Sequence, residues 1–284
     1  MRGAAARPNA APRSVERPAT RLGVVGWPVA HSRSPAIQNA ALPAVGLTGW
    51  RYQLLPIPPE LFAETVRALP EAGFRGVNVT IPHKQTALAL ATAPTPRARG
   101  IGAANTLLFE ADGAVVADNT DAPGLIAALP FAAAGRSALV LGAGGSARAV
   151  VWALLDAGAS EVRIWNRTPA RARALSCEIG GVSVDEAEPA DLLIHCTASG
   201  LAAGQDAFET LPIAADDVAN FECVVDLVYG DAETPLVRAA RARGVAGVGG
   251  RELLVRQGAL SFELFTGRPA PAELMRRAVE ARRT

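Results

Sequence analysis

The sequence has 284 residues, of which 50% are apolar, and a formal net charge of +1 at pH 7. This length favours two domains, and the near-neutral charge gives no electrostatic reason to expect a nucleic acid or an anionic membrane surface as a partner. The three cysteines (Cys177, Cys196 and Cys223) lack the paired spacing of a disulfide framework or a zinc site, which favours a reducing, cytoplasmic setting. No apolar run reaches the roughly 20 residues of a transmembrane helix.

Residues 1–20 form a segment rich in alanine, arginine and proline, with Glu16 as its one acidic residue. The composition has some likeness to a transit peptide, but it lacks an amphipathic rhythm and its prolines interrupt any helix. We therefore expect a disordered extension, because such a segment buries too little apolar surface to fold.

From residue 21 onward, short β-rich runs alternate with alanine- and leucine-rich stretches of helical character. The predicted strands span residues 22–26, 51–57, 76–81, 105–109, 115–117, 138–142, 162–166, 192–196 and 223–228. Helical patterns lie between them, for example at 59–69, which begins with proline, and at 147–157. This alternation predicts an α/β protein with parallel sheets.

A glycine-rich turn at 142–145 opens a second α/β run, so we expect a domain boundary near Asp121. The two predicted domains span residues 21–120 and 121–249. The remaining residues, 250–284, are helical in pattern and contain no further strand, so their sequence alone allows them to cover either domain.

The run HSRSPAIQNA at 31–40 directly follows the first predicted strand. Ser34 followed by Pro35 is typical of a helix start with the serine as N-cap. A helix start also favours an anion, so Ser32 and Ser34 are candidates for binding one. We expect His31 to hold this turn through backbone hydrogen bonds rather than to act in catalysis.

Polar side chains also follow strands in the runs GVNVTIPHK, GAANTLL and ADNTDAPG. Buried amides need hydrogen-bond partners, so asparagines at strand ends either satisfy the backbone or bind a ligand. The polar candidates in these runs are Asn78, Thr80, His83, Lys84, Asn105, Thr106, Asn119, Thr120 and Asp121.

The run SALVLGAGGSARAVV combines an apolar strand, a glycine-rich turn and a helix in the spacing G-x-G-x-x-A. In such a turn the first glycine permits a tight bend, the second lets the backbone approach a pyrophosphate, and the small third residue allows close packing of helix on strand. The backbone N–H groups at the helix start then receive the negative charge. The predicted dinucleotide-binding residues are Gly142, Ala143, Gly144, Gly145, Ser146 and Ala147.

The end of the next strand indicates which dinucleotide binds. An NAD site expects an acidic residue about 20 residues past the glycines, for the ribose 2′-hydroxyl. The run NRTPAR offers instead two neutral polar residues and two guanidiniums, which suit a 2′-phosphate. We therefore predict NADP as the cofactor, bound by Asn166, Arg167, Thr168 and Arg171, with Arg173 on a solvated helix face.

Together these segments resemble the shikimate dehydrogenase family. The matching motifs are G-x-P-x-x-H-S-x-S-P at 26–35, N-V-T-x-P-x-K at 78–84, G-A-x-N-T at 102–106, D-N-T-D at 118–121, G-A-G-G-x-x-R at 142–148, N-R-T-x-x-R at 166–171 and Q-G-A at 257–259. They occur in register from about residue 22 to residue 271 and leave only the N-terminal extension outside.

The resemblance implies a substrate domain completed by helices within 250–284, a Rossmann-type NADP-binding domain, and an active site in the cleft between them. Ser32 and Ser34 are implied to bind the carboxylate of shikimate. Lys84 is the implied catalytic acid/base, paired with Asp121, and Tyr229 is implied to lie near substrate and nicotinamide. The ring hydroxyls are implied to be held by Thr80, Asn105, Asp121 and Gln257.

The chain departs from the family pattern in three places. The family's usual Asn-Ala-Thr run reads His-Cys-Thr at 195–197; we expect this stretch to line the cofactor cleft through Thr197, with no catalytic role for His195. The family's D-G-x-x-M-L run reads GGRELL at 249–254, which keeps Gly250 as a cofactor-binding residue but changes its surroundings. Trp27 replaces a small polar residue.

The implied reaction is the reversible, NADP-dependent reduction of 3-dehydroshikimate to shikimate in aromatic amino acid biosynthesis, without a metal, by a cytoplasmic monomer or homodimer. Whether Lys84 donates the proton itself or mainly polarises the carbonyl stays open. Three alternatives also stay open: a sister dehydrogenase for quinate or aminoshikimate, a non-catalytic regulator that binds shikimate or a nucleotide, and a Rossmann dehydrogenase for another small acid. The regulator gives no reason for an intact Lys84 and Asp121, and the last gives none for the paired serines.

Overall fold

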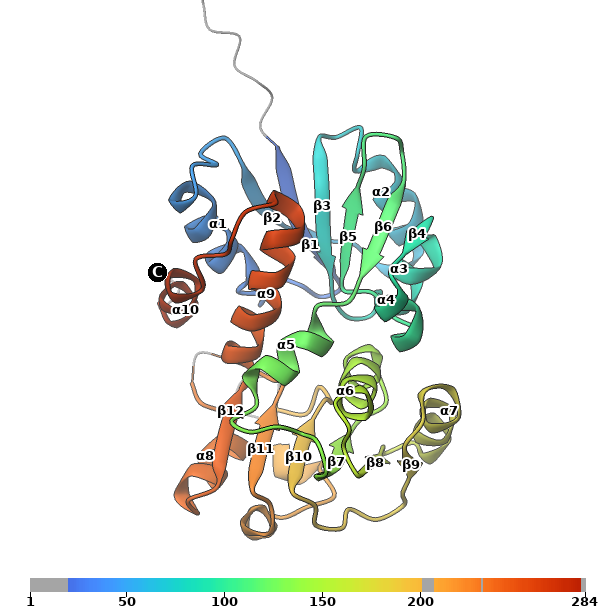
Figure 1. Ribbon diagram of the computed structural model, residues 1–284, viewed down its shortest axis with the longest axis vertical. Helices are drawn as coiled ribbons and strands as arrows, with labels where there is room; N and C mark the ends of the chain where they lie inside the picture. The colour runs from blue at the N-terminus through green and yellow to red at the C-terminus, as the bar shows by residue number, and fades with distance from the viewer. Residues whose placement is uncertain (1–19, 201–206, 231, 282–284) are drawn as a thin grey trace, which may run out of the picture.

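The computed structural model describes residues 20–200, 207–230 and 232–281. These residues form two six-stranded sheets, which lie one above the other in Figure 1. The disordered extension expected at 1–20 falls outside the described residues except for Thr20, whose carbonyl accepts a hydrogen bond from the backbone N–H of Arg51.

The first sheet comes from the first part of the chain. Its strands are β1 (Arg21–Gly26), β2 (Arg51–Pro56), β3 (Phe74–Val79), β4 (Ala93–Pro94), β5 (Thr106–Phe109) and β6 (Val115–Asp118), in the order β2-β1-β3-β5-β6-β4. The helices in this part are α1 (Ser34–Ala44), the 3₁₀ turn η1 (Pro59–Leu61), α2 (Phe62–Ala68), α3 (Lys84–Leu90) and α4 (Pro96–Ile101). Because β1 pairs in parallel with β2 and β3, the carboxyl ends of these strands share one edge of the sheet.

The first sheet corrects the expectation of purely parallel sheets. β5 pairs antiparallel with both β3 and β6. The connection from β5 to β6 is a tight turn in which Gly113 has φ +87° and the N–H of Glu110 donates to the carbonyl of Ala114. So short a connection joins antiparallel neighbours only, since a parallel pair needs a crossover of a dozen or more residues. The Asp-Gly step at 112–113 is the sequence signal for this hairpin.

The second sheet is parallel throughout its described strands. These are β7 (Ser137–Leu141), β8 (Glu161–Trp165), β9 (Val182–Ser183), β10 (Leu192–His195), β11 (Cys223–Asp226) and β12 (Ala246–Gly249), in the order β12-β11-β10-β7-β8-β9. Its helical segments are α5 (Asp121–Ala128), α6 (Gly145–Asp156), α7 (Pro169–Ile179), η2 (Ala207–Glu209), η3 (Asp216–Asn220) and α8 (Pro235–Ala242). The strand order reverses beside β7, and in open α/β sheets a ligand binds at the carboxyl ends of the strands at such a point.

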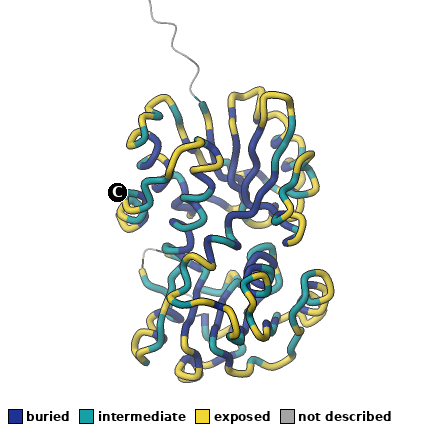
Figure 2. The backbone as a smooth tube through the Cα atoms, in the orientation of Figure 1, coloured by how far each residue is buried: buried dark blue, intermediate teal, exposed yellow. Residues whose placement is uncertain are grey.

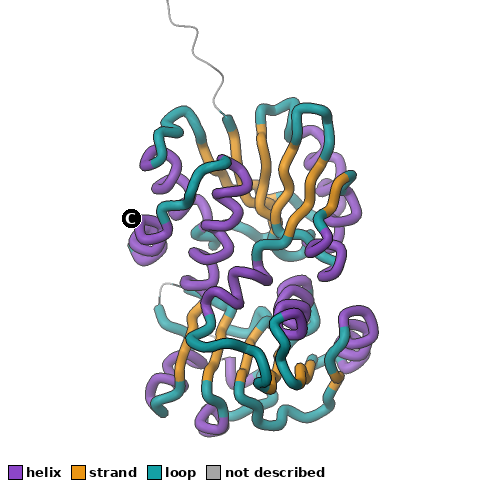
Figure 3. The backbone as a smooth tube through the Cα atoms, viewed as in Figure 1, coloured by secondary structure: helices purple, strands orange, loops and turns teal. Residues whose placement is uncertain are grey.

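Every strand expected from the sequence forms, and the α/β class with a Rossmann-type sheet is confirmed. The short strands β4, β9 and β12 were not expected. Each has only two to four residues, and none carries a strong apolar pattern. Helices lie around the strands of both sheets, and the strands are mostly buried (Figures 2 and 3).

The last two helices follow β12 but return to the first sheet. They are α9 (Gly250–Thr266) and α10 (Ala272–Glu280). Phe262 and Phe265 of α9 are fully buried in one cluster with Leu22 and Ile37. α9 also packs along α5 between the two sheets (Figure 1). This packing is close because Gly124 has no side chain: a Cβ there would lie 3.0 Å from the backbone nitrogen of Gln257.

None of the helices among the described residues has both the length and the apolar composition needed to cross a bilayer.

Candidate active site

A cavity of about 160 Å³ lies between the two sheets, where the ends of β1 and β3 face α5, α6 and α9. The residues predicted for substrate binding and proton transfer all line it: Ser32, Ser34, Thr80, Lys84, Asn105, Asp121, Tyr229 and Gln257. His31, Asn78, Ser146 and Gly250 line it as well. The fold therefore brings together side chains from distant parts of the sequence in one cavity.

The turn that carries Ser32 and Ser34, called the serine turn below, differs from the sequence prediction, in which Ser34 caps α1. Ser34 is the first residue of α1, and the cap position belongs to Arg33, which makes no side-chain cap bond. The turn is stabilised from the other side, because the Ser32 hydroxyl accepts a hydrogen bond from the Ser34 N–H at 3.3 Å. The expected N-cap role of Ser34 is thus wrong by one position. Both serines are buried and line the cavity.

Arg33 fixes this turn to the C-terminal helix. Its guanidinium donates to the carbonyls of Val279 at 2.7 Å and Ala281 at 3.0 Å, at the end of α10. The last carbonyls of a helix lack intrahelical partners, and the negative end of the helix dipole favours a cation there. The turn with the two serines is therefore held by α10.

Lys84 is the only lysine in the sequence. It is the first residue of α3, and its side chain is 9% exposed. Its Nζ donates to Asp121 Oδ2 at 2.7 Å and to Ser146 Oγ at 2.9 Å. A lysine ammonium can release a proton, whereas an arginine guanidinium in a protein cannot. The one lysine of an arginine-rich chain thus lies in this cavity.

The carboxylate of Asp121 is oriented through both of its oxygens. Oδ2 accepts from Lys84, and Oδ1 accepts from Asn105 Nδ2 at 2.8 Å. The amide of Asn105 is itself fixed, because its Oδ1 accepts from the backbone N–H of Thr120 at 2.8 Å. Asp121 is also the first residue of α5, where the positive end of the helix dipole favours a negative charge. The pair of Lys84 and Asp121 is therefore a rigid charged unit.

A buried polar network behind the cavity joins Asn78, one of the polar candidates, to Ser261 and Tyr52, which were not predicted as part of the site. Asn78 Nδ2 donates to Ser261 Oγ at 2.9 Å, and the Tyr52 hydroxyl donates to Asn78 Oδ1 at 2.7 Å. Burial raises the pKa of Tyr52 well above its ordinary value, so its hydroxyl stays a donor. A signal for Ser261 exists in the sequence, since it lies four residues after Gln257 and thus on the same face of α9. Tyr52 gives no such signal, because its position reads as an ordinary inward strand residue.

His83 lies outside the cavity, as its expected peripheral role requires. Its ring stacks on Phe62 with the centroids 4.3 Å apart, and its Nε2 hydrogen-bonds to the carbonyl of Ile57 at 2.7 Å. Burial lowers the pKa of His83 from its ordinary value. The ring is therefore a neutral part of the core beside β3.

We expect His83 to make the fold sensitive to mild acid. Because its pKa is lowered in the fold, the unfolded chain binds the proton first, and the free energy of unfolding falls as the pH drops through about 6.5. One such group contributes at most about 1.4 kcal/mol per pH unit. Urea unfolding at about pH 7.5 and about pH 5.5 is expected to show a smaller loss in His83→Gln than in the wild type. Equal losses in the two proteins would contradict this role.

The glycine-rich turn between β7 and α6 has the shape that a dinucleotide requires. Gly142 has φ +121°, and a Cβ there would lie 3.2 Å from both the Cys196 carbonyl carbon and Thr197 Cγ2. A Cβ on Gly144 would meet nothing within 4 Å, so the turn is open on that side. The twelve-residue α6 begins at this turn without a side-chain cap, and the first N–H groups of a helix lack intrahelical partners, which fits a pyrophosphate.

A second cavity, of about 290 Å³, lies at the end of β8. Five predicted cofactor residues line it: Asn166, Arg167, Thr168, Arg171 and Thr197. Among the described residues, its lining includes no acidic side chain, and neither arginine has an ion-pair partner. Arg173 is exposed and does not line the cavity. Two unpaired guanidiniums without a carboxylate fit a 2′-phosphate.

His195 lies behind Thr197, the residue expected to line the cofactor cleft. It is fully buried and does not line the second cavity, although Thr197 does. Its Nδ1 hydrogen-bonds to Asp226 Oδ1 at 2.9 Å and its Nε2 to Thr197 Oγ1 at 2.6 Å. The imidazole therefore lies behind Thr197 and holds it.

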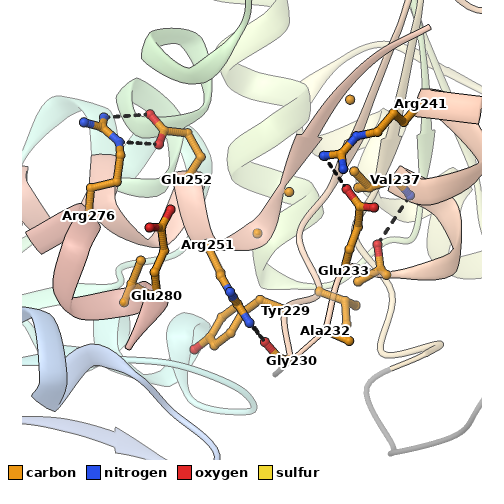
Figure 4. A pocket seen from close by; sticks show the side chains of 16 residues that line it. Tyr229, Gly230, Ala232, Glu233, Val237, Arg241, Arg251, Glu252, Arg276 and Glu280 are labelled. Atoms are coloured by element: carbon orange, nitrogen blue, oxygen red, sulfur yellow. Dashed lines mark hydrogen bonds and ion pairs between the residues drawn. The ribbon is translucent and has the colours of Figure 1, made fainter. Parts of the chain in front are cut away.

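The residues at 249–254, where the chain departs from the family pattern, contact the loop after β11. Arg251 lines a third cavity, of about 310 Å³, and its Nη2 donates to the carbonyl of Gly230 at 2.6 Å (Figure 4). Gly230 follows Tyr229, which lines both this cavity and the first one. Glu252 accepts from Arg276 Nε at 3.0 Å, which joins α9 to α10. The altered residues thus tie the Tyr229 loop, α9 and α10 together.

Gly250, predicted to bind the cofactor, lines the first and third cavities. A Cβ there would lie 2.5 Å from the Leu227 carbonyl oxygen, so only glycine lets α9 begin this close to the loop. Among the residues that the structure describes, no three His, Cys, Asp or Glu side chains group as a metal site does.

Comparisons with known proteins indicate one family. Three family models match: the shikimate dehydrogenase substrate binding domain over residues 24–107, shikimate / quinate 5-dehydrogenase over 126–207, and the shikimate 5'-dehydrogenase C-terminal domain over 250–280. The shikimate dehydrogenase (NADP(+)) of Paracoccus denitrificans (strain Pd 1222) is 44% identical over 269 residues, covering 91% of this chain and 95% of the relative. That of Methylobacterium radiotolerans is 46% identical over 268 residues, covering 88% and 92%.

Solved structures give the same result. The crystal structure of shikimate 5-dehydrogenase from Thermus thermophilus in complex with NADP(H) and shikimate has a TM-score of 0.80 and 41% identity to this chain. The match covers 92% of this chain and 98% of that one. With relatives this similar over nearly their whole length, the chain belongs to the shikimate dehydrogenase family.

Proposed function

We propose that the chain catalyses the reversible reduction of 3-dehydroshikimate to shikimate with NADPH, a step of aromatic amino acid biosynthesis. The observation that carries this proposal is the pair of Lys84 and Asp121, 2.7 Å apart, in a cavity that also contains Ser32 and Ser34. Family membership supplies the reaction class, and the cavity supplies the residues that perform it.

The substrate enters with its carboxylate toward the serine turn. The hydroxyls of Ser32 and Ser34 donate to the carboxylate beside the positive end of α1. The ring hydroxyls lie toward the amides and the remaining hydroxyl groups of the cavity. The residues assigned to them are Thr80, Asn105, Asp121 and Gln257, with Tyr229 closing the site from the loop after β11.

Lys84 supplies the proton that the carbonyl oxygen of the substrate takes up. NADPH, when bound, supplies a hydride to the carbonyl carbon. The carbonyl oxygen then gains negative charge and takes a proton from the Lys84 ammonium, which yields the alcohol and a neutral amine. Asp121 keeps the lysine in place through the hydrogen bond from Nζ to Oδ2. In the oxidative direction the amine accepts the proton and the same steps run in reverse.

The cofactor assignments rest on the two turns of the second sheet. Gly142, Ala143, Gly144, Gly145, Ser146 and Ala147 form the turn for the pyrophosphate. Asn166, Arg167, Thr168 and Arg171 surround the cavity assigned to the 2′-phosphate and adenine. Thr197 and Gly250 complete the cofactor side of the cleft.

The roles of the two domains follow from these residue assignments. Residues 21–120, with the helices in 250–284, act as the substrate domain, and residues 121–249 act as the NADP-binding domain. The enzyme works in the cytoplasm as a monomer or homodimer, with neither a nucleic acid nor a membrane as partner. The free thiols of Cys177, Cys196 and Cys223 and the near-neutral net charge support this setting.

Calorimetric titration with shikimate tests the substrate assignment. The wild type is expected to bind shikimate, and the double variant Ser32→Ala/Ser34→Ala to bind it about 100-fold more weakly, since each hydroxyl bond to a carboxylate contributes about 1.5 kcal/mol. Ser176→Ala is the matched control, because the Ser176 hydroxyl on α7 donates to the carbonyl of Gly181, away from the cavity. Absence of binding by the wild type would leave a dehydrogenase of another small acid as the better assignment.

A further inference from the structure

The glycine-rich turn contributes a side chain as well as backbone N–H groups to the cleft. Ser146 is the second residue of α6, and its Oγ accepts a hydrogen bond from Lys84 Nζ at 2.9 Å. Lys84 belongs to α3 beside the first sheet, so this bond crosses from one sheet to the other. The assignment of Ser146 to the pyrophosphate uses only its backbone and leaves this contact unexplained.

The first turn of α6 also packs closely against the aliphatic part of the Lys84 side chain. A Cβ on Gly145 would lie 3.2 Å from Lys84 Cβ and 3.3 Å from Lys84 Cδ. Both distances are shorter than ordinary carbon contacts, so glycine at this position lets the lysine stem run along the first turn of α6. Gly145 and Ser146 together fix the stem and the ammonium.

Two partners determine where the third N–H bond of the ammonium points. An ammonium has three N–H donors in a tetrahedral arrangement. One donates to Asp121 and one to Ser146, and no other acceptor within the described residues contacts Nζ. With Asp121 as its one partner, the ammonium could turn about the hydrogen bond from Nζ to Asp121 Oδ2. With both partners in place, the third N–H has one direction.

We propose that Ser146 is a positioning residue for proton transfer: its hydroxyl, together with Asp121, aims the third N–H of Lys84 at the reacting oxygen of the substrate. This inference rests on the proposed role of Lys84. The glycine-rich turn before α6 then has two roles: its backbone binds the dinucleotide, and its Ser146 side chain orients the N–H of Lys84 that is transferred. Ser146 acts through Lys84 and does not itself exchange a proton with the substrate.

The kinetic test uses Ser146→Ala, which removes one oxygen and keeps Cβ on a helical position. At saturating shikimate and NADP, kcat is expected to fall about tenfold, the value of one hydrogen bond to a charged group. The KM for NADP stays close to that of the wild type, since the backbone N–H groups of the turn are unchanged. Ser176→Ala on α7 is the control and keeps the wild-type kcat.

A double-mutant cycle separates positioning from a structural effect. In a Lys84→Ala background, Ser146→Ala is expected to cause no further loss of kcat, because the group that it positions is absent. An equal loss with and without Lys84 would overturn the proposal, and so would an unchanged kcat in the single variant. A rise in the KM for NADP at constant kcat would also overturn it and would assign the hydroxyl to the dinucleotide.

Nuclear magnetic resonance gives a readout that needs no cofactor. Because Lys84 is the only lysine, ¹⁵N-lysine labelling yields a single side-chain ammonium signal. Ser146→Ala is expected to shift this signal and to speed its proton exchange with water, whereas Ser176→Ala leaves it unchanged; an unaffected signal in Ser146→Ala would overturn the proposal. Failure of the proposed function is distinguishable, since it appears as a wild type without turnover of shikimate.

Discussion

Lys84→Ala is expected to lower kcat for shikimate oxidation by about 10²- to 10⁴-fold, the usual contribution of a positioned proton-transfer group. Shikimate binding changes far less, because the carboxylate and ring hydroxyls have other partners in the cavity. Initial rates at saturating substrates measure the first quantity, and calorimetric titration of the variant with shikimate measures the second. Together they separate a chemical role of Lys84 from a binding role.

Two further variants complete this experiment. Gln85→Ala changes the exposed neighbour on α3 and is expected to keep the wild-type kcat. Lys84→Arg keeps a positive charge but not a transferable proton, so it is expected to be nearly as inactive as Lys84→Ala if the lysine donates the proton. Substantial activity in the arginine variant would indicate polarisation of the carbonyl instead. Survival of most turnover in Lys84→Ala would contradict the catalytic assignment altogether.

Arg171→Ala is expected to raise the KM for NADP by about 10- to 100-fold and to leave the KM for NAD nearly unchanged. The reason is that a guanidinium bonded to a phosphate contributes about 1.5 to 3 kcal/mol, and NAD lacks the 2′-phosphate. Arg171 lines the second cavity and has no ion-pair partner in the described parts of the chain, so its loss leaves no carboxylate unpaired. Initial rates with each dinucleotide at saturating shikimate measure the effect.

The same helix provides the control for this experiment. Arg173 is exposed on α7 two residues later and does not line the cavity. Arg173→Ala removes the same charge and is expected to leave both KM values close to those of the wild type. If the two variants weaken NADP equally, the effect comes from the general field of the protein and not from a contact of Arg171.

Most of the site residues could be predicted from the sequence, because they lie in short motifs at strand ends. Lys84 follows β3, Asp121 follows β6, and the turn with Ser32 and Ser34 follows β1, so the predicted strands alone place each motif at a strand end. Gln257 is different: its proximity to Asn105 depends on α9 returning to the first sheet, and only the resemblance to a family indicated this. No local pattern specifies such a return.

Contacts between distant segments account for what the sequence did not predict. The bond between Ser146 and Lys84 joins two motifs that each have their own local explanation, so neither motif alone indicates it. The buried position of His195 likewise depends on Asp226 in the neighbouring strand. The expected N-cap at Ser34 failed for a local reason, because the Ser32 hydroxyl stabilises the turn and α1 begins one residue early.

One steady-state assay tests the central claim most directly: oxidation of shikimate and of quinate, each measured with NADP and with NAD. The site predicts the highest kcat/KM for shikimate with NADP. The first cavity combines Lys84 and Asp121 with Ser32 and Ser34, and the described lining of the second cavity offers two guanidiniums and no acidic residue. A clear preference for quinate with NAD, or no turnover of any pair, would contradict it.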